Sequence, residues 1–232
     1  MRSHPVITID GPAGAGKSTV SRLLARELSF CYLDTGALYR ALACGAMERK
    51  LSPEQCGAME DVCGAMGLDL VPSGHEFRIF VSGEDVTEKL RTESIGFLAS
   101  VISASENIRK ALLPLQRRLA EKGSIVAEGR DMGTVVFPGA EFKFFLTADL
   151  SERAKRRFRE LEEKNEAVAY EKVKESIEKR DGQDTGRRIA PLRVPEDAVV
   201  IDTTGLTIGE VVGKMQSVIR AKGWESSHED RS

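Results

Sequence analysis

Short runs of β-branched and other apolar residues alternate along this chain with longer stretches in which apolar residues recur every three or four positions. The longer stretches, such as 20–28, predict helices with one buried face. The short runs predict buried strands at 6–9, 30–33, 124–127, 142–146 and 199–201. Because strands that alternate with helices usually form parallel sheets, we expect an α/β fold with a mostly parallel sheet covered on both faces.

Residues 68–87 interrupt this alternation. They contain short alternating or β-branched runs, separated by the turn-forming segments 72–74 and 82–83. Such runs, bounded by Gly, Pro and Ser, are typical of antiparallel strands joined by tight turns. We therefore predict a small antiparallel meander inserted into the α/β chain.

Two helices have recognisable first residues. Ser52-Pro53-Glu54-Gln55 has the form of a capping box with proline at the first helical position, and Thr207 begins a second box with Glu210. We expect one helix to start at the first box and a long final helix to start at the second. The residues that the first helix should bury are Cys56, Met59, Cys63 and Met66.

Residues 151–193 are rich in charge, with 13 Lys or Arg, 10 Asp or Glu and few large apolar side chains. A solvated helical face is the usual explanation of such a stretch. Because the segment lies between two predicted core strands, it also fits a mobile cover over a binding site.

The overall composition is that of a globular protein: 232 residues, 41% hydrophobic, 30% charged, with a formal net charge of −2. This length predicts one domain, and this apolar content excludes disorder for most of it. Without a basic excess we expect no nucleic-acid partner. Without an apolar run of ~18–20 residues or a signal-peptide core we expect no membrane span and a cytoplasmic location.

Cysteine and histidine usage argues against metal and triad chemistry. The four cysteines contain no C-x-x-C pair and have no histidine nearby, so we expect reduced, mostly packed side chains. His4 and His228 lie near the ends, and His75 lies in a predicted turn. We therefore expect no histidine-based triad or metal cluster.

Between the first predicted strand and helix, Gly11-Pro12-Ala13-Gly14-Ala15-Gly16-Lys17-Ser18 matches the pattern G-x-x-x-x-G-K-[ST]. Backbone N–H groups of such a loop curl around a phosphate chain, and the helix N-terminus adds a positive dipole. Lys17 can reach the outer phosphates, and the Ser18 hydroxyl is placed to hold Mg²⁺. Since both flanks fit, a plain glycine-rich turn is the weaker interpretation, and we predict an ATP or GTP site.

Two other short motifs have competing interpretations. Leu33-Asp34-Thr35-Gly36 resembles the active-site triplet of aspartic proteases, but those proteins are all-β, whereas a helix is expected here. The segment 202–205 is similar to a GTPase switch, but the chain has no N-K-x-D guanine-reading motif. We interpret its aspartate as a residue at the end of a strand.

The densest polar group, Arg130-Asp131 between glycines, follows the predicted strand 124–127. It therefore lies at the carboxyl edge of the sheet, where ligands of open α/β folds bind. Further arginines occur in 180–192 and at positions 40 and 109. Any one of them is most often solvated. Together they predict a second, phosphorylated ligand opposite the glycine-rich loop, because guanidinium groups clamp phosphate oxygens bidentately.

These motifs, in this order, resemble bacterial cytidylate kinases. The likeness covers residues 4–222 and is carried by VITIDGPAGAGK (6–17), LDTGALYR (33–40), GRDMGTVVFP (129–138) and the block 180–192. At Thr35 many members have serine, and the hydroxyl is kept. The resemblance implies an α/β fold like that of nucleoside monophosphate kinases. Its parts would be a parallel five-stranded sheet, helices on both faces, a small antiparallel β insertion and a helical lid.

The resemblance also implies how a single domain is divided. The core would comprise 4–35, 105–150 and 191–222, and the acceptor-binding region with its antiparallel insertion would be about 36–104. A lid of about 151–190 would close over ATP, and 223–232 would form a polar tail.

The activity that the resemblance implies is ATP-dependent phosphorylation of CMP and dCMP by a monomer, with Mg²⁺ held by Ser18. Lys17, Arg40, Arg130 and Arg187 would be catalytic. ATP would bind the loop from Gly11 to Thr19 and Arg157 of the lid. CMP would contact Thr35, Arg40, Ser100, Arg109, Arg130, Asp131, Arg180, Asp184 and Arg187. Within that set, Ser100, Arg109 and Asp131 would read the cytosine, and Arg180 and Asp184 would hold the ribose.

The chemistry fits this residue set. The acceptor is a phosphate oxygen, already an anion at neutral pH, so positioning and charge stabilisation suffice without a strong base. A lid would exclude water from the γ-phosphate. The alternatives are another small-metabolite or nucleotide kinase of this architecture and a P-loop ATPase or switch protein. ADP production tested with each nucleoside monophosphate separates all three.

Overall fold

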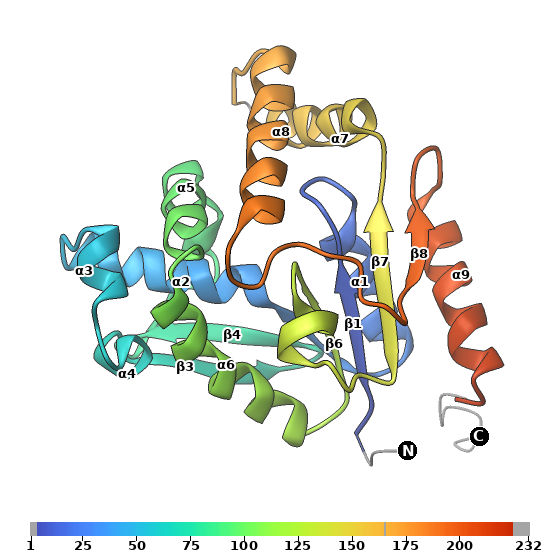
Figure 1. The fold of residues 1–232 in the computed structure, drawn as a ribbon, viewed down its shortest axis with the longest axis horizontal. Helices are drawn as coiled ribbons and strands as arrows, with labels where there is room; N and C mark the ends of the chain where they lie inside the picture. The colour runs from blue at the N-terminus through green and yellow to red at the C-terminus, as the bar shows by residue number, and fades with distance from the viewer. Residues whose placement is uncertain (1–3, 165, 225–232) are drawn as a thin grey trace.

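The computed structural model describes residues 4–164 and 166–224. Its centre is a parallel sheet in the order β2-β6-β1-β7-β8, which confirms the predicted α/β architecture (Figure 1). These strands are β1 (Val6–Asp10), β2 (Cys31–Asp34), β6 (Ile125–Gly129), β7 (Phe142–Thr147) and β8 (Val199–Asp202). Because β1 is central, the loop that follows it lies in the middle of the sheet's carboxyl edge.

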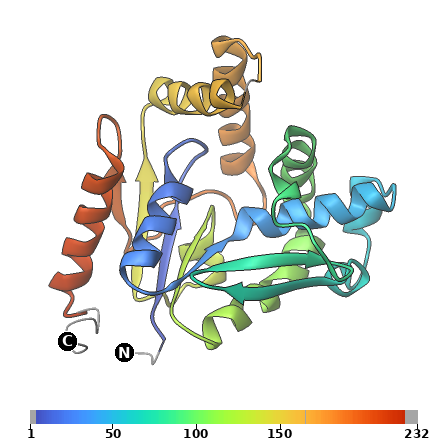
Figure 2. The same ribbon diagram turned by 180° about the vertical axis from the view of Figure 1, so that it is seen from behind.

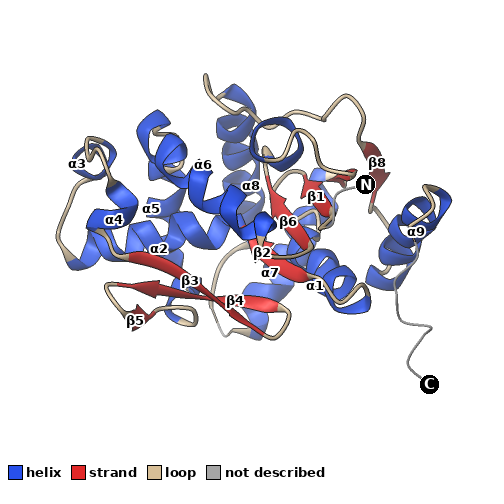
Figure 3. Ribbon diagram, turned by 90° about the horizontal axis from the view of Figure 1, so that it is seen from below, coloured by secondary structure: helices blue, strands red, loops and turns tan. Residues whose placement is uncertain are grey.

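The antiparallel insertion belongs to the same sheet, so the sheet has eight strands rather than the five expected. Its strands are β3 (Leu68–Ser73), β4 (Glu76–Val81) and β5 (Glu84–Asp85), paired as predicted in an antiparallel meander (Figure 3). The connection is a short parallel pairing of Tyr32 with Glu76, where the Tyr32 N–H donates to the His75 carbonyl at 2.7 Å. The backbone groups at the edge of β2 thereby find partners.

Helices cover both faces of the parallel strands. Ile7 and Ile9 of β1 face α1 (Lys17–Glu27) and α9 (Ile208–Ala221), which Figure 2 shows in front of the sheet. Val6 lies in the other apolar cluster, because successive side chains of a strand point to opposite faces. The helices of that second cluster are α2 (Thr35–Glu48), α5 (Glu93–Ile102) and α6 (Glu106–Glu121).

The predicted capping box at Ser52 is present, but the single helix expected after it is divided in two. The two helices are α3 (Pro53–Gly57) and α4 (Val62–Ala65). The reason is a second cap: the Asp61 side chain accepts a hydrogen bond from the Gly64 N–H at 2.9 Å and starts a new helix. Cys56 and Met66 are buried as expected, whereas Met59 and Cys63 are only partly buried. The capping box of α9 at Thr207 is also confirmed.

The charged segment forms two helices, α7 (Leu150–Glu163) and α8 (Tyr170–Gly186), which stand above the carboxyl ends of the parallel strands (Figure 1). Two short turns complete the fold: a 3-10 turn, Lys89–Arg91, and a single π-turn, Met132–Val136. Of the predicted tail, Trp224 packs edge-on against Phe30 at 4.9 Å between ring centroids, and 225–232 lie outside the described residues. No helix in the described ranges combines the length and apolar character that a membrane crossing requires.

Candidate active site

The glycine-rich loop joins β1 to α1, as the motif predicts. Gly16 caps the helix in the left-handed region, at φ 86°. Gly11 has φ +148°, and a Cβ there would stand 2.1 Å from the Leu146 carbonyl oxygen of β7, so only glycine fits. The Lys17 ammonium folds over the loop and donates to the Pro12 carbonyl at 2.7 Å. The loop is thus the tight backbone cradle that a phosphate-binding site requires.

Asp10, the last residue of β1, ties this loop to the segment after β6. Its carboxylate accepts hydrogen bonds from the backbone N–H groups of Met132 and Gly133, both at 2.8 Å. Burial raises the pKa of Asp10 to about 6, although these two hydrogen bonds act in the opposite direction. Sequence reasoning assigned no role to Asp10, although it falls within the matching segment 6–17. Its position immediately before the motif was the available signal.

Glu128, at the end of β6, is a second residue that sequence reasoning did not select. The Tyr32 hydroxyl donates to its carboxylate, and the Ser18 hydroxyl also hydrogen-bonds this group. Burial, reinforced by the negative charge of Asp34, raises the pKa of Glu128. Thr35, expected at the acceptor site, is buried and donates to the Glu128 carbonyl at 2.7 Å. Glu128 therefore lies where the loop and the predicted acceptor residues meet.

Asp184 of α8 brings together two of the predicted arginines. Its carboxylate accepts from Arg130 Nε at 2.6 Å and pairs with Arg187 Nη2 at 2.5 Å. Burial alone would raise the pKa of Asp184, but the charges of Arg130 and Arg187 outweigh it and lower the pKa. On the loop side, burial and the charge of Arg130 lower the pKa of Lys17 to about 7. A cluster of guanidinium groups therefore lies next to the phosphate-loop lysine.

Arg109 and Asp131 form a buried ion pair, with side chains only 8% and 5% exposed. Arg109 also donates to the Ser103 carbonyl at 3.1 Å and lies 5.5 Å from the ring centroid of Tyr39. The π-face of that ring favours the cation. A fixed donor and a fixed acceptor are thus held side by side, which is the arrangement that base recognition needs.

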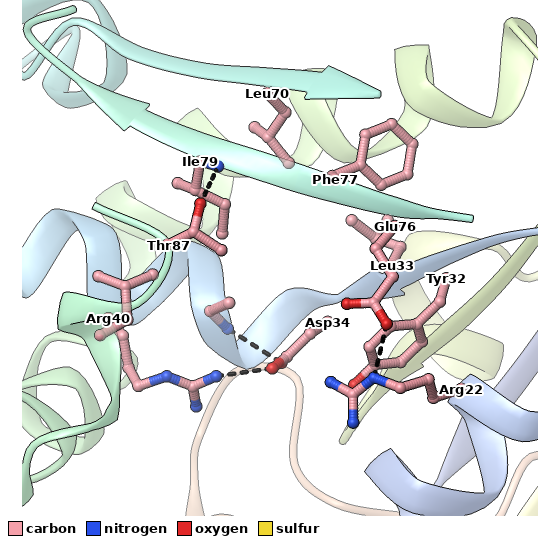
Figure 4. A pocket seen from close by; sticks show the side chains of 12 residues that line it. Arg22, Tyr32, Leu33, Asp34, Arg40, Leu70, Glu76, Phe77, Ile79 and Thr87 are labelled. Carbon is pink, nitrogen blue, oxygen red and sulfur yellow. Dashed lines mark hydrogen bonds and ion pairs between the residues drawn. The ribbon is translucent and has the colours of Figure 1, made fainter. Parts of the chain in front are cut away.

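Arg40 approaches from α2, where its Nη2 pairs with Asp34 at 2.6 Å while Asp34 caps the helix through the Ala37 N–H. Figure 4 shows this pair beside a small pocket whose other side carries the ion pair of Arg22 with Glu76. The Arg40 Nε is buried and has no hydrogen-bond partner within the described part of the chain. Such a donor is one that a bound anion would satisfy.

Of the remaining predicted residues, Ser100 and Arg180 are connected with α8 and the cluster, whereas Arg157 and Thr19 show no contact with it in the described residues. Ser100 of α5 donates to Gln183 of α8 at 3.5 Å, which links these two helices. Partial loss of hydration and the charge of Arg130 lower the pKa of Arg180 to about 10, so it stays protonated at neutral pH. Arg157 pairs with Glu160 on the exposed side of α7. Thr19 is exposed at the start of α1.

A phosphate-binding loop at the carboxyl edge of a parallel sheet, with a buried guanidinium cluster beside it, defines a P-loop phosphotransferase. The sequence model of the cytidylate kinase family, described as "Cytidylate kinase", matches residues 7–221. This chain therefore belongs to the cytidylate kinase family and is a kinase.

Similar proteins support this placement. A cytidylate kinase of Carboxydothermus hydrogenoformans is 49% identical over 216 residues, covering 93% of this chain and 97% of that protein. A cytidylate kinase of Vibrio cholerae is 44% identical, covering 96% of this chain and 99% of the relative. Among solved structures, a gluconokinase from Sinorhizobium meliloti has a TM-score of 0.50 at 14% identity, covering 95% of each chain. That likeness shows a shared fold.

Proposed function

We propose that this protein transfers the γ-phosphoryl group of ATP to CMP and dCMP, giving ADP and the diphosphates. The observation that carries the proposal is the guanidinium cluster of Arg130 and Arg187, fixed by Asp184 beside Lys17. A cluster of this kind suits an acceptor that itself carries phosphate. A kinase whose acceptor is an uncharged hydroxyl needs guanidinium groups only for the transferring phosphoryl group.

The acceptor phosphate is held by Arg40, Arg130 and Arg187 in this proposal. The unpartnered Arg40 Nε gives one free buried donor, and the other two guanidiniums are already oriented by Asp184. Lys17 lies on the ATP side of the site. There it neutralises the charge that develops on the transferring phosphoryl group. Because the attacking phosphate oxygen is already anionic, no protein base has to remove a proton.

The cytosine is read by Arg109 and Asp131, with Ser100 nearby and with Arg180 and Asp184 at the ribose. Cytosine presents acceptors at N3 and O2 beside a donor amino group at C4, which match an arginine and a carboxylate. Uracil carries a hydrogen at N3 and an oxygen at C4, so both contacts become mismatched. A competing interpretation is that Asp131 only orients Arg109, with which it forms the buried pair.

Mg²⁺ is the metal that this reaction employs, and the Ser18 hydroxyl is suited to hold it. Ser18 is exposed at the start of α1 and adjoins the Glu128 carboxylate, and oxygen ligands are those that Mg²⁺ prefers. The described residues contain no group of three or more metal-binding side chains, so phosphates and water would complete its shell. When bound, the ion neutralises phosphate charge.

We also propose that ATP contacts the loop from Gly11 to Thr19 and Arg157, and that the enzyme is a cytoplasmic monomer. The formal net charge of −2 gives no basic excess that would favour a nucleic-acid partner. Light scattering on the purified protein and fractionation of cells measure the two properties directly.

The experiment that tests the function is ADP formation from ATP with CMP, dCMP, UMP, AMP, shikimate or no acceptor. We expect rapid turnover with CMP and dCMP only. Turnover with a hydroxyl acceptor, or equal ATP hydrolysis without any acceptor, would contradict the proposal.

A further inference from the structure

One residue of the phosphate-binding loop, Ala13, is held by the two lid helices through every group it has. Its N–H donates to Asp181 Oδ1 of α8 at 3.2 Å, and its carbonyl accepts from Arg153 Nη1 of α7 at 3.0 Å. Its methyl group lies in a small apolar cluster separate from the main core. The other buried members of that cluster are Ala154, Leu161, Val173 and Ile177.

Arg153 is fixed on three sides. Its Nε donates to the Ala148 carbonyl, just after β7, at 2.9 Å, and the same guanidinium forms an ion pair with Asp181. With a side chain only 9% exposed, Arg153 is among the least accessible charged groups of the lid. The contacts from the Ala13 carbonyl to Arg153, to Asp181 and back to the Ala13 N–H form a closed ring.

Helix α7 also packs directly on the next loop residue. A Cβ at Gly14 would stand 3.0 Å from both the Cβ and the carbonyl oxygen of Arg153, and Gly14 has φ +74°. A second connection runs from Arg156, which donates to Thr203 Oγ1 at 3.0 Å, to the Ala15 carbonyl. The Thr203 hydroxyl lies 3.3 Å from that carbonyl and 3.0 Å from the Thr147 carbonyl, so its one hydrogen is shared between the two acceptors. The contact between lid and loop is therefore continuous over three loop residues.

Two carbonyls of the loop, those of Ala13 and Ala15, are held by side chains from outside the loop. A phosphate cradle needs its N–H groups turned toward the anion, which requires the carbonyls of the same peptides to turn outward. Arg153 of α7 and Thr203, which follows β8, bind the carbonyls of Ala13 and Ala15, whose peptides carry the N–H groups of Gly14 and Gly16. Arg153 thus helps to keep the loop in its binding shape.

We propose that Ala13 is the anchor between the lid and the phosphate-binding loop, and that Arg153 and Asp181 are positioning residues for the donor nucleotide. The inference rests on the proposed function, since it assigns ATP to this loop. Neither side chain needs to touch ATP. Loss of the anchor leaves the cluster of Arg130 and Asp184 in place. It should therefore weaken the binding of ATP without weakening the binding of CMP.

The competing interpretation is that the ion pair only braces α7 against α8. Both interpretations expect a lower melting temperature when the pair is removed. Only the anchor interpretation predicts a selective loss of affinity for ATP. Only this interpretation predicts faster hydrogen exchange at the Ala13 amide.

The test compares Asp181→Ala, Asp181→Asn and Arg153→Gln with two exposed control variants on the same helices, Glu178→Gln and Arg159→Gln. Calorimetry gives the Kd of a non-hydrolysable ATP analogue and of CMP. We expect Asp181→Ala and Arg153→Gln to raise the ATP-analogue Kd by ~10-fold or more, as for loss of a charged hydrogen bond. The CMP Kd should stay within about twofold, well under the ~10-fold that 1.4 kcal/mol represents.

Asp181→Asn keeps an acceptor for the Ala13 N–H and should recover part of the affinity. If Asp181→Ala does not fold, the affinity of Asp181→Asn for the ATP analogue is used in its place. The double variant Arg153→Gln with Asp181→Asn should be no weaker than Arg153→Gln alone, because both act on one ring. Equal losses for ATP analogue and CMP, or an unchanged ATP-analogue Kd in folded protein, would overturn the anchor.

Amide exchange supplies a readout that does not depend on activity. The Ala13 N–H of free Asp181→Ala should exchange faster than in wild type, whereas Glu178→Gln leaves it unchanged. Unchanged exchange at Ala13 would also overturn the proposal. If wild type forms no ADP with CMP, the proposed acceptor is wrong, yet analogue binding and Ala13 exchange still decide the anchor.

Discussion

In the proposed function, the ATP-binding half and the CMP-binding half of the site are constructed differently. The donor half is a contiguous loop, 11–18, whose shape depends on the backbone conformations of Gly11 and Gly16. The acceptor half is made of side chains from α2, α6, α8 and the segment after β6, held by ion pairs such as Arg130 with Asp184. Backbone shape is encoded locally, whereas the ion-paired cluster exists only after the chain has folded.

The two halves also differ in how they are stabilised when no substrate is bound. A loop of backbone amides can be emptied and filled with little rearrangement, because the N–H groups carry only partial charges. Buried guanidiniums need a counter-charge at all times, and Asp184 and Asp131 supply it in the free protein. In the proposed function, substrate phosphate therefore enters a cluster that is already paired, and we expect single changes there to affect folding as well as binding.

The largest effect is expected on the donor side. Lys17→Ala should lower kcat by about 100- to 1000-fold, as for removal of one group that stabilises transition-state charge. The fold should persist, because the hydrogen bond that the Lys17 ammonium makes among the described residues is to a carbonyl of the loop itself, that of Pro12. Steady-state turnover together with circular dichroism measures both. Near-normal kcat in a folded variant would show that the loop is not the donor site.

The substitution Asp184→Asn tests the CMP-binding half of the site. With the charge gone, Arg130 and Arg187 lose their common counter-ion, and we expect the KM for CMP to rise by ~10-fold or more while the KM for ATP changes little. Initial rates with each substrate varied give the two constants. A rise confined to the KM for ATP would show that Asp184 supports ATP binding and not CMP binding.

The same variant has a defined pH signature. Arg130 and Arg187 lower the pKa of Asp184, so its ionised form stabilises the fold above the unfolded pKa of about 3.9. That stabilisation is lost as the pH falls through the lowered folded pKa. The difference in the free energy of unfolding between wild type and Asp184→Asn should be constant near neutrality and shrink below about pH 4. Denaturant titrations between pH 3 and pH 7 measure it.

Asp131→Asn sharpens the comparison within the acceptor half. An amide can donate to the uracil oxygen, so the CMP-to-UMP ratio of kcat/KM should narrow by ~10-fold, the equivalent of 1.4 kcal/mol. If Asp131 only orients Arg109, both substrates lose efficiency together and the ratio stays fixed. The ratio, rather than either rate, is the deciding quantity.

The contrast also explains what the sequence could predict. The loop, the five parallel strands and the capping boxes at Ser52 and Thr207 are local patterns, and all are present. The junction of β4 with β2 depends on one long-range pairing, Tyr32 with Glu76, for which the sequence has no local signal. The division of the helix after Ser52 was missed because the cap at Asp61 resembles any helical aspartate in sequence.

For the site, sequence reasoning selected the arginines together with Asp131 and Asp184, but it did not predict which of them form ion pairs. Asp10 and Glu128 were overlooked because an acidic residue at a strand end is common, and only folding brings Met132 and Tyr32 to them. The contact of Asp181 with Ala13 spans 168 positions along the chain. Contacts of this range depend on which helix covers which edge of the sheet, and that is decided by the whole core.

The smallest expected effect is on motion. The regions 151–190 and 68–100 should close on the substrates, because water has to be kept from the γ-phosphate and both regions border the site. Amide exchange measured with CMP and a non-hydrolysable ATP analogue should be slower in both regions than in the free protein. Strands β1 and β6, buried in the sheet, serve as the internal control.

If Ala13 anchors the lid, protection should increase most near the turn between α7 and α8, far from the anchor, and least around Arg153. Uniform protection along α7 would mean that the lid moves as a whole and releases the loop, and equal exchange in both states would mean that no closure occurs.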